Sequence, residues 1–446
     1  MMQVGVSQPG ARALLTRLFQ AGLQAVDPYE AVCRQVSLQR GRLTIGSQHY
    51  SLQLLHRIVV VGAGKASARM AQALERQLGP RIDTGLVVVK YGHGAPTKRI
   101  RIVEAAHPVP DAAGLQASRM IMTLIGTLKP DDLLIVLLSG GASSLLPAPA
   151  PGISLRDKQQ TTKLLLRSGA TIQEMNAVRK HLSRVKGGQL AAATPARVAS
   201  VILSDVIGND LGTIGSGPTA PDPTTFREAW TILERYRAGT RLPTSVRRRM
   251  EAGIGKSVAE TPKAGAGLFR RVHNVLIGDN EAAVDALAQV AKGQGLHTLV
   301  LSTTVTGEAR EIAKLFGAMA REIVAHGRPV RRPCCVIAGG ETTVTVRGQG
   351  QGGRAQEFAL AAALEIAGLP KVWVAGFATD GTDGPTPAAG AVVSGETLAR
   401  AQRGKLNLIR ALQQNDAYPV FKKLNGHIVT GPTGTNVNDL YLLLAL

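Results

Sequence analysis

Long apolar runs are missing from this chain of 446 residues. The longest such run at a strand position covers residues 133–138, whereas a membrane-spanning helix needs about 20 apolar residues. The sequence therefore predicts no membrane partner. The N-terminus also lacks an apolar segment followed by a small-residue cleavage site. Residues 11–25 have the spacing of a basic amphipathic helix, which favours a core helix over an organelle-targeting segment.

Cysteine is scarce, since only Cys33, Cys334 and Cys335 are present. The count is odd, and two neighbours in one strand do not easily form a disulfide with each other. This usage fits a reducing compartment, so we expect a cytoplasmic protein.

Acidic and aromatic residues are also few. The chain has 31 Asp and Glu against 52 Lys and Arg, which gives a net charge of +21, and aromatic residues make up only 3%. Such a charge favours polyanionic partners. The basic residues are dispersed, however, the densest cluster (residues 247–249) is short, and no known nucleic-acid-binding signature occurs. We therefore expect no nucleic-acid partner. A basic nucleic-acid-binding protein is kept as a third hypothesis, after the two enzyme functions given below.

The length exceeds what one hydrophobic core usually supports, so we expect two domains. In the first half, β-rich apolar segments alternate with helical patterns at residues 66–77, 115–128 and 155–166, which predicts repeated βαβ units. The strand segments are residues 57–61, 86–89, 101–105, 133–138 and 198–203.

The second half resumes after a Pro-rich and basic stretch at residues 218–267. Its predicted strands are residues 272–277, 298–301, 334–337, 372–376, 427–430 and 440–444, with an antiparallel pair or edge strand at 342–346. The predicted fold is α/β with two domains. Residues 1–240 form a doubly wound, Rossmann-like parallel sheet, and residues 241–446 form an α/β domain with a mixed sheet.

Ligands of open α/β sheets bind beyond the carboxyl ends of the strands, so the loops at these ends are the candidate sites. The first such loop contains Gly62, Gly64 and Lys65. Its glycines allow close backbone approach, the following helix offers unpaired amides to an anion, and Lys65 adds a positive charge. A Walker A loop needs a glycine six residues before its lysine and Ser or Thr directly after it. It is excluded because Val59 and Ala66 occupy these two positions.

The same loop also resembles a degenerate dinucleotide fingerprint, with Ser67 in place of the third glycine. The next strand ends at Lys90 rather than at an acid, which counts against NAD and leaves NADP open. The second loop, Ser139-Gly140-Gly141-Ala142-Ser143, combines hydroxyls and amides that suit a carboxylate or phosphate. A tight turn that needs glycine is the alternative.

Acidic residues follow two other strands. Asp205 lies in one post-strand loop, and Asp380, Thr382 and Asp383 lie in another. Carboxylates at such positions can bind Mg²⁺ through water or act as a general base. Helix capping by Asp205 and simple acid-Gly turns at 379–384 are the alternatives.

Arg354 follows a glycine-rich segment at the start of a predicted helix, and Glu341 ends a strand. A guanidinium beside the positive end of a helix dipole is unfavourable unless an anion faces both, which suggests a polyphosphate ligand. An arginine facing water is the alternative. His107, before Pro108, is equally a substrate contact or a hydrogen-bonded loop histidine.

Together these segments closely resemble the glycerate 2-kinase family, whose C-terminal portion is called the MOFRL domain and some of whose members were labelled hydroxypyruvate reductases. The resemblance covers nearly the whole chain and places the MOFRL region at about residues 333–446. It is carried by residues 61–67, 107–111, 139–146, 186–188, 204–210, 217–219, 339–346, 352–357, 379–390 and 434–439. Ala355 and Asn209 depart from the family pattern, which usually has Asn and an acid there.

The resemblance implies ATP and Mg²⁺ as cofactors, D-glycerate as the substrate, 2-phosphoglycerate as the product, and an active site in the cleft between two α/β domains. It assigns the catalytic roles to Lys65, Arg354 and Asp380, with Asp380 either activating the 2-hydroxyl or binding the metal. From their positions after strands, Asp205 and Asp383 are the predicted Mg²⁺ ligands. The residues expected to bind substrate or nucleotide are Gly62, Gly64, His107, Ser139, Gly140, Gly141, Ala142, Ser143, Lys186, Glu341, Gly353, Thr382 and Asn436. An NADPH-dependent hydroxypyruvate reductase is the alternative function. Whether the protein forms a homodimer is left open.

Overall fold

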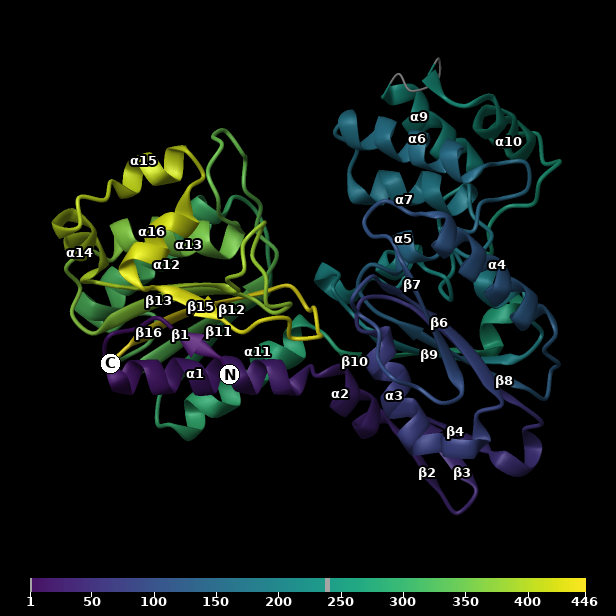
Figure 1. The fold of residues 1–446 in the computed structure, drawn as a ribbon, viewed down its shortest axis with the longest axis horizontal. Coiled ribbons are helices and arrows are strands. Elements are labelled where there is room, and N and C mark those ends of the chain that lie inside the picture. Colours follow the sequence, from purple (N-terminus) through teal and green to yellow (C-terminus); the bar gives the residue numbers. More distant parts are fainter. Residues whose placement is uncertain (1, 237–240) are drawn as a thin grey trace. The chain divides into compact units, whose positions relative to one another are not determined.

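The computed structural model describes residues 2–236 and 241–446, and the chain forms two compact units. The central unit spans Pro28–Ile277. The terminal unit combines Met1–Asp27 with Gly278–Leu446 and so contains both chain ends (Figure 1). The predicted boundary lay between residues 240 and 241, so this division differs from the prediction. Residues 237–240 lie outside the described part of the chain.

Two packing contacts explain the difference. Helix α1 (Pro9–Ala25) packs against α11 (Asn280–Gly293), which attaches the N-terminal helix to the later part of the chain. Strand β10 (Val272–Gly278), which we assigned to the second domain, instead pairs with the last strand of the first sheet. Strand periodicity predicts that a strand exists but does not reveal which sheet it joins.

The central unit contains a sheet of order β10-β9-β8-β5-β6-β7. Neighbouring strands from β9 through to β7 run parallel, as predicted. The chain passes from β5 outward to β6 and β7, then returns to β8 and β9 on the other side, so the topological switch point lies between β5 and β8. The bounds are Ile58–Ala63 (β5), Thr84–Lys90 (β6), Ile100–Ala105 (β7), Leu133–Leu138 (β8) and Arg197–Leu203 (β9).

Helices cover both faces of this sheet. Helix α4 (Ala112–Gly126) shares one core with side chains of β5, β6 and β8. Helix α3 (Ser67–Leu78) contacts β6, β7 and β8, but its buried side chains lie outside that core, which places it on the opposite face. A small antiparallel sheet of β2 (Val36–Gln39), β3 (Arg42–Ile45) and β4 (Gln48–Ser51), which the sequence analysis missed, follows α2 (Pro28–Gln35).

A separate helical layer completes the central unit (Figure 1). It consists of α6 (Leu155–Arg167), α7 (Ile172–His181), α9 (Phe226–Arg235) and α10 (Thr244–Ile254), which share their own apolar core. Ser154, Thr171 and Thr225 begin three of these helices with reciprocal capping boxes, which satisfy backbone N–H groups that would otherwise lack partners. The short helices α5 (Ala142–Leu145) and α8 (Gln189–Ala192) follow loops of the sheet.

The terminal unit has a sheet of order β1-β15-β14-β13-β16-β12-β11. Only β11 and β12 pair in parallel among the recorded neighbours, so the sheet is mixed, as predicted. The bounds are Gln3–Val4 (β1), His297–Val305 (β11), Cys334–Gly340 (β12), Val372–Ala378 (β13), Gly390–Ser394 (β14), His427–Val429 (β15) and Asp439–Ala445 (β16).

The prediction of a strand at residues 342–346 was wrong, since only an isolated bridge between Glu308 and Thr343 forms there. The polar groups of this segment bind side chains instead of a neighbouring strand. Thr345 donates its N–H and hydroxyl to the Glu308 carboxylate, at 3.1 and 2.7 Å. Its alternation of polar and apolar residues therefore reflects a loop anchored by side chains.

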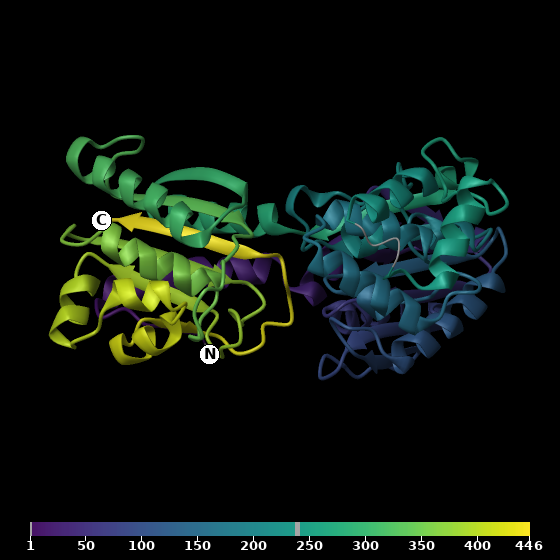
Figure 2. The same cartoon turned by 90° about the horizontal axis from the view of Figure 1, so that it is seen from above.

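Helices α1 and α11 lie on one face of the terminal sheet, and α12 (Ala309–His326), α13 (Arg354–Glu365) and α16 (Ala417–Leu424) on the other (Figures 1 and 2). The rings of Phe316, Phe358 and Tyr441 pack together beneath α12 and α13. Short helices α14 (Thr397–Arg403) and α15 (Leu408–Gln413) complete this layer. This packing fixes the start of α13, where Arg354 lies.

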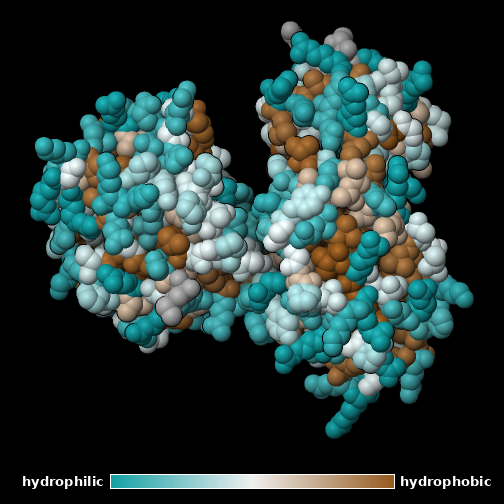
Figure 3. Space-filling model, viewed as in Figure 1, coloured by the Kyte–Doolittle hydropathy of each residue, from teal (hydrophilic) through white to brown (hydrophobic). Residues whose placement is uncertain are grey.

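Hydrophilic side chains cover much of the visible face of each unit, whereas hydrophobic ones gather around α6 and α7 (Figure 3). Within the described ranges, no helix has the length and apolar character needed to cross a bilayer. All three cysteines are free, and burial raises the pKa of Cys335 to about 12, so this thiol stays protonated.

Candidate functional site

The structure brings the first two predicted loops together at the switch point. Lys65 donates its backbone N–H to Gly140 O at 2.8 Å, and Ala66 donates its N–H to Ser139 Oγ at 3.0 Å. Ser67 Oγ lies 3.0 Å from Ser139 Oγ. The buried Ser139 hydroxyl therefore joins the two loops and supports the start of α3, which positions the site.

Two glycines are required by this arrangement. Gly64 has φ +140°, and a Cβ there would lie 2.1 Å from Ser139 Oγ. Gly141 has φ +89°, and a Cβ there would lie 3.0 Å from His107 Cδ2 and 3.6 Å from Lys65 Cγ. Loops from three strands thus place His107, Gly141 and Lys65 side by side at the carboxyl edge of the sheet.

His107 is neutral in this setting. Burial, together with the positive charges of Lys65 and Lys90 and with His93, lowers its pKa to about 4. At neutral pH the ring therefore offers one donor and one acceptor and adds no charge. The prediction of His107 as a ligand contact fits its place on the wall of the cavity described next.

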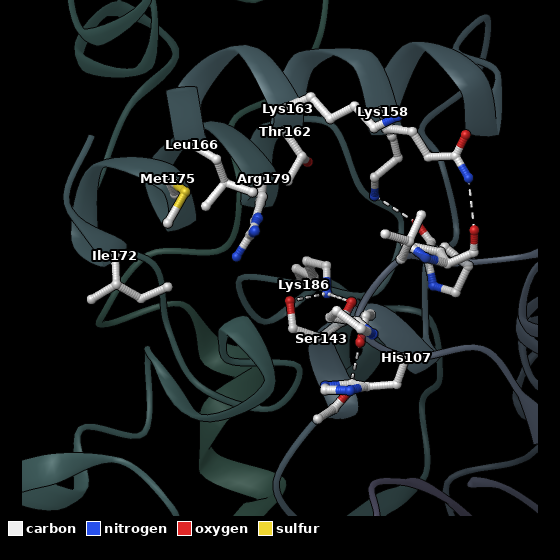
Figure 4. Close-up of a pocket in the computed structure, with 17 residues that line it drawn as sticks. His107, Ser143, Lys158, Thr162, Lys163, Leu166, Ile172, Met175, Arg179 and Lys186 are labelled. Atoms are coloured by element: carbon white, nitrogen blue, oxygen red, sulfur yellow. Dashed lines mark hydrogen bonds between the residues drawn. The ribbon is translucent and has the colours of Figure 1, made fainter. Parts of the chain in front are cut away.

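A cavity of about 400 Å³ opens beside these loops, between the sheet edge and the helical layer (Figure 4). Helix α6 contributes Lys158, Thr162 and Leu166, spaced by four residues along one face, and α7 contributes Ile172, Met175 and Arg179 from its own inward face. His107, Gly141 and Ser143 line the opposite wall.

The cavity carries several positive charges. Lys186 is buried, and its Nζ donates to Ser143 O at 2.6 Å and to Ser143 Oγ at 2.9 Å. Burial lowers its pKa well below the ordinary value, and the nearby Lys158 and Arg179 add to this effect. Lys158 donates to Pro147 O at 2.5 Å, and burial together with Arg179 and Arg249 lowers its pKa to about 7.

No described residue that lines this cavity is acidic. Lys186 was among the predicted binding residues, but Lys158, Lys163 and Arg179 were missed. The sequence does show basic residues on one face of α6 and of α7. That these faces line a site becomes clear only once both helices are known to pack over the Ser139 loop. The cavity can therefore hold an anion with more than one charge.

In the terminal unit, Arg354 begins α13, as predicted, and two carboxylates hold it. Its Nε and Nη2 donate to Asp439 at 2.6 and 3.2 Å, and its Nη1 donates to Glu341 at 2.6 Å. Asn438 Nδ2 supports Glu341 at 2.9 Å. Asp439 was missed as a site residue, although it stands at the start of an otherwise apolar strand and pairs in register with Gly340.

These contacts keep Arg354 charged. Burial alone would lower its pKa, but Asp439 and Glu341 raise it. Burial raises the pKa of Asp439 to about 7, although Arg354 acts in the opposite direction. Three of the five guanidinium N–H groups are used, and the remaining two, on Nη1 and Nη2, have no acceptor among residues 2–236 and 241–446. These two donors are available to a phosphate or carboxylate oxygen.

The predicted acidic loop at 379–384 lies beside the start of α13. Asp383 is buried, and its two oxygens accept from the N–H groups of Ala355 and Gln356, at 3.1 and 2.8 Å. Burial raises its pKa, and these bonds oppose that shift. Gly353 is needed because a Cβ would lie 2.3 Å from Asp383 Oδ1. Both oxygens thus cap α13, which argues against the predicted metal role.

The other predicted residues of this unit form short local contacts. Asp380 Oδ1 accepts from the N–H and hydroxyl of Thr382, at 3.0 and 3.2 Å. Asn436 Oδ1 accepts from Asn438 N at 3.2 Å. Ala355, where the family pattern has Asn, is fully buried and uses only its backbone N–H.

The carboxylates predicted to hold Mg²⁺ do not share a unit, since Asp205 follows β9 in the central unit and Asp383 caps α13 in the terminal one. The described ranges contain no cluster of three or more His, Cys, Asp or Glu suited to a metal. Mg²⁺ in phosphotransferases usually takes one or two carboxylates and substrate phosphates. Asp383, whose two oxygens cap α13, does not fit that pattern, whereas Asp205 stays a predicted ligand.

Comparisons with known proteins agree with this arrangement. The chain matches the model described as domain of unknown function DUF4147 over residues 14–251 and the MOFRL family model over residues 334–439. It is 39% identical to glycerate 2-kinase of Pyrococcus horikoshii over 97% of each chain. It is 42% identical to an Agrobacterium vitis protein provisionally named hydroxypyruvate reductase, over 97% of this chain and 94% of that one.

Among solved structures, glycerate kinase from Thermotoga maritima superposes with a TM-score of 0.88 at 39% identity, covering 98% of this chain and 100% of the other. The similarity thus extends through both units. The chain belongs to the glycerate 2-kinase family.

Proposed function

We propose that the protein transfers the terminal phosphoryl group of ATP, with Mg²⁺, to the 2-hydroxyl of D-glycerate, giving 2-phosphoglycerate and ADP. One observation carries the proposal. The loops after β7 and β8, beside Lys65, line a cavity whose described lining residues include several basic side chains and no acid. The names of the relatives from Pyrococcus horikoshii and Thermotoga maritima support glycerate as the acceptor.

Phosphoryl transfer asks a protein mainly to position two substrates and to stabilise charge on the transferred group, without a covalent residue. Lys65 contributes a positive charge beside the amides at the start of α3. Arg354 contributes the two free N–H groups described above. In the proposal both neutralise negative charge that develops on the transferred phosphoryl group.

Asp380 is the residue proposed to receive the proton of the 2-hydroxyl. Its Oδ1 is held by Thr382, and its Oδ2 has no hydrogen-bond partner in the described part of the chain. Mg²⁺, when bound, would neutralise the phosphate oxygens of the nucleotide, and the carboxylate of Asp205, in the loop after β9, is the residue proposed to hold it. The cytoplasmic location and the absence of a nucleic-acid partner stay predictions. Whether the protein forms a homodimer stays an open question.

The second candidate is an NADPH-dependent hydroxypyruvate reductase. It is favoured by the spacing of Gly62 and Gly64, by Lys90 at the end of β6 and by the provisional name of the Agrobacterium vitis relative. Against it, the hydroxyl of Ser67 occupies the third glycine position and is tied to Ser139. A dinucleotide fold uses that glycine for close packing of helix and strand.

One experiment separates the two functions. The purified protein is incubated with ATP, Mg²⁺ and D-glycerate, and the product isomer is identified by phosphorus NMR. A parallel sample receives hydroxypyruvate and NADPH, and its NADPH absorbance is followed. We expect 2-phosphoglycerate in the first sample and no loss of NADPH in the second. Loss of NADPH without a phosphate ester would reject the kinase proposal.

A further inference from the structure

The cavity of the central unit has two chemically different ends. Helices α6 and α7 are joined by the short turn at residues 168–171, so the end of α6 and the start of α7 lie near each other. These adjoining ends carry Leu166 and Ile172, with Met175 one turn further along α7. Leu166 and Ile172 are 57% and 44% exposed, so the apolar end lies at the mouth of the cavity.

The other end is cationic. Lys158 lies two turns before Leu166 on α6, and Arg179 lies two turns after Ile172 on α7. Both point into the same space as Lys186 (Figure 4). The two lysines donate to neutral oxygens of Pro147 and Ser143, and no residue of the described part of the chain hydrogen bonds to the Arg179 guanidinium.

Two lysines and an arginine grouped without a carboxylate disfavour one another's charged forms, so the lysines hold their protons less tightly unless an anion stabilises the positive charge. The mutual effect is visible because Arg179 helps to lower the pKa of both lysines. A structural role would normally pair each cation with an acid, as Lys180 pairs with Asp222 nearby at 3.2 Å. The unpaired arrangement indicates a ligand with several negative charges.

We infer that this cavity seats the nucleoside triphosphate, with its phosphates against Lys158, Arg179 and Lys186 and its base against Leu166, Ile172 and Met175. The assignment rests on the proposed kinase function and says which substrate of that reaction occupies this site. A small hydroxy acid has no apolar part to cover the exposed Leu166 and Ile172. A nucleotide also matches a cavity of about 400 Å³ far better than glycerate does.

The test is equilibrium binding of ATP to the full-length protein by calorimetry, without glycerate. Arg179→Gln removes one phosphate contact and should weaken ATP binding about tenfold or more. Leu166→Asp should weaken ATP binding as strongly but leave the binding of inorganic tripolyphosphate within about twofold, because that probe lacks a base. Arg167→Gln, on the exposed side of the same helix, is the matched control and should change neither.

Steady-state kinetics complete the test. We expect Arg179→Gln to raise the KM for ATP and to leave the KM for glycerate unchanged. Unchanged ATP affinity in both cavity variants, or a rise in the KM for glycerate alone, overturns the inference while leaving the kinase function intact. ATP binding that depends on Arg179 in a protein that does not phosphorylate glycerate supports the inference and rejects the proposed function.

Discussion

Replacing Asp439 by asparagine removes one negative charge while nearly preserving the shape of the side chain. In the wild type the fully buried Asp439 holds Arg354 through two hydrogen bonds, and Tyr441 OH donates to the same carboxylate at 3.1 Å. The amide turns one of the two acceptors into a donor that faces the guanidinium. Losing one charge-assisted bond costs about 1.5–3 kcal/mol.

If this loss falls on the transition state, kcat/KM drops roughly ten- to 150-fold, since each 1.36 kcal/mol is a factor of ten. The pH profile supplies a second measure. Burial raises the pKa of Asp439 to about 7, so protonation below that pH weakens its hold on Arg354. The wild-type kcat/KM should therefore fall as the pH drops through about 7, and the Asp439→Asn variant should lack this decline.

The assay is kcat/KM for glycerate at saturating ATP across neutral pH, with circular dichroism to verify folding. Glu311→Gln is the control, because within the described part of the chain the Glu311 carboxylate pairs with the exposed Lys314 of the same helix, α12. A variant within about twofold of the wild type at every pH would refute the positioning role. An equal loss at all pH values would show that Asp439 does not titrate in the working range.

Three further variants test the packing around the site. Gly141→Ala should lower the free energy of unfolding by about 1–3 kcal/mol and reduce turnover, because φ is +89° and the new Cβ would press on His107. The control is Gly152→Ala, where φ is +79° but the space around the new Cβ is open, so it measures the backbone cost alone. Phe358→Ala should cost about 3–5 kcal/mol in urea unfolding, since it removes a ring from a buried cluster. Asp383→Ala should cost about 1–2 kcal/mol by uncapping α13, and recovery of its activity by excess Mg²⁺ would instead favour a metal role.

Local sequence patterns predicted the elements that are buried on both faces. The strand at Leu133–Leu138 has the predicted bounds, and β5 and β9 differ by a residue or two, because a buried apolar run leaves little freedom in where a parallel strand begins and ends. The loops after them were found for the same reason, since ligand sites follow strand ends.

Contacts between distant segments were not predictable from local patterns. The assignment of β10 to the first sheet depends on its pairing with β9. Asp439 gains its role only when β16 lies beside β12 and brings it to Arg354. Likewise, the basic residues of α6 and α7 look like an ordinary solvated surface until the helices pack over the loop of Ser143.

The most direct test of the account is the single-turnover rate of phosphoryl transfer from ATP to D-glycerate in Lys65→Ala, Arg354→Ala and the double variant, each verified as folded. Both residues are proposed to stabilise the same transferred group. Each single change should therefore slow the reaction by about a hundredfold or more, and the double variant should be little slower than the slower single one. Near-wild-type rates in either single variant would contradict the account.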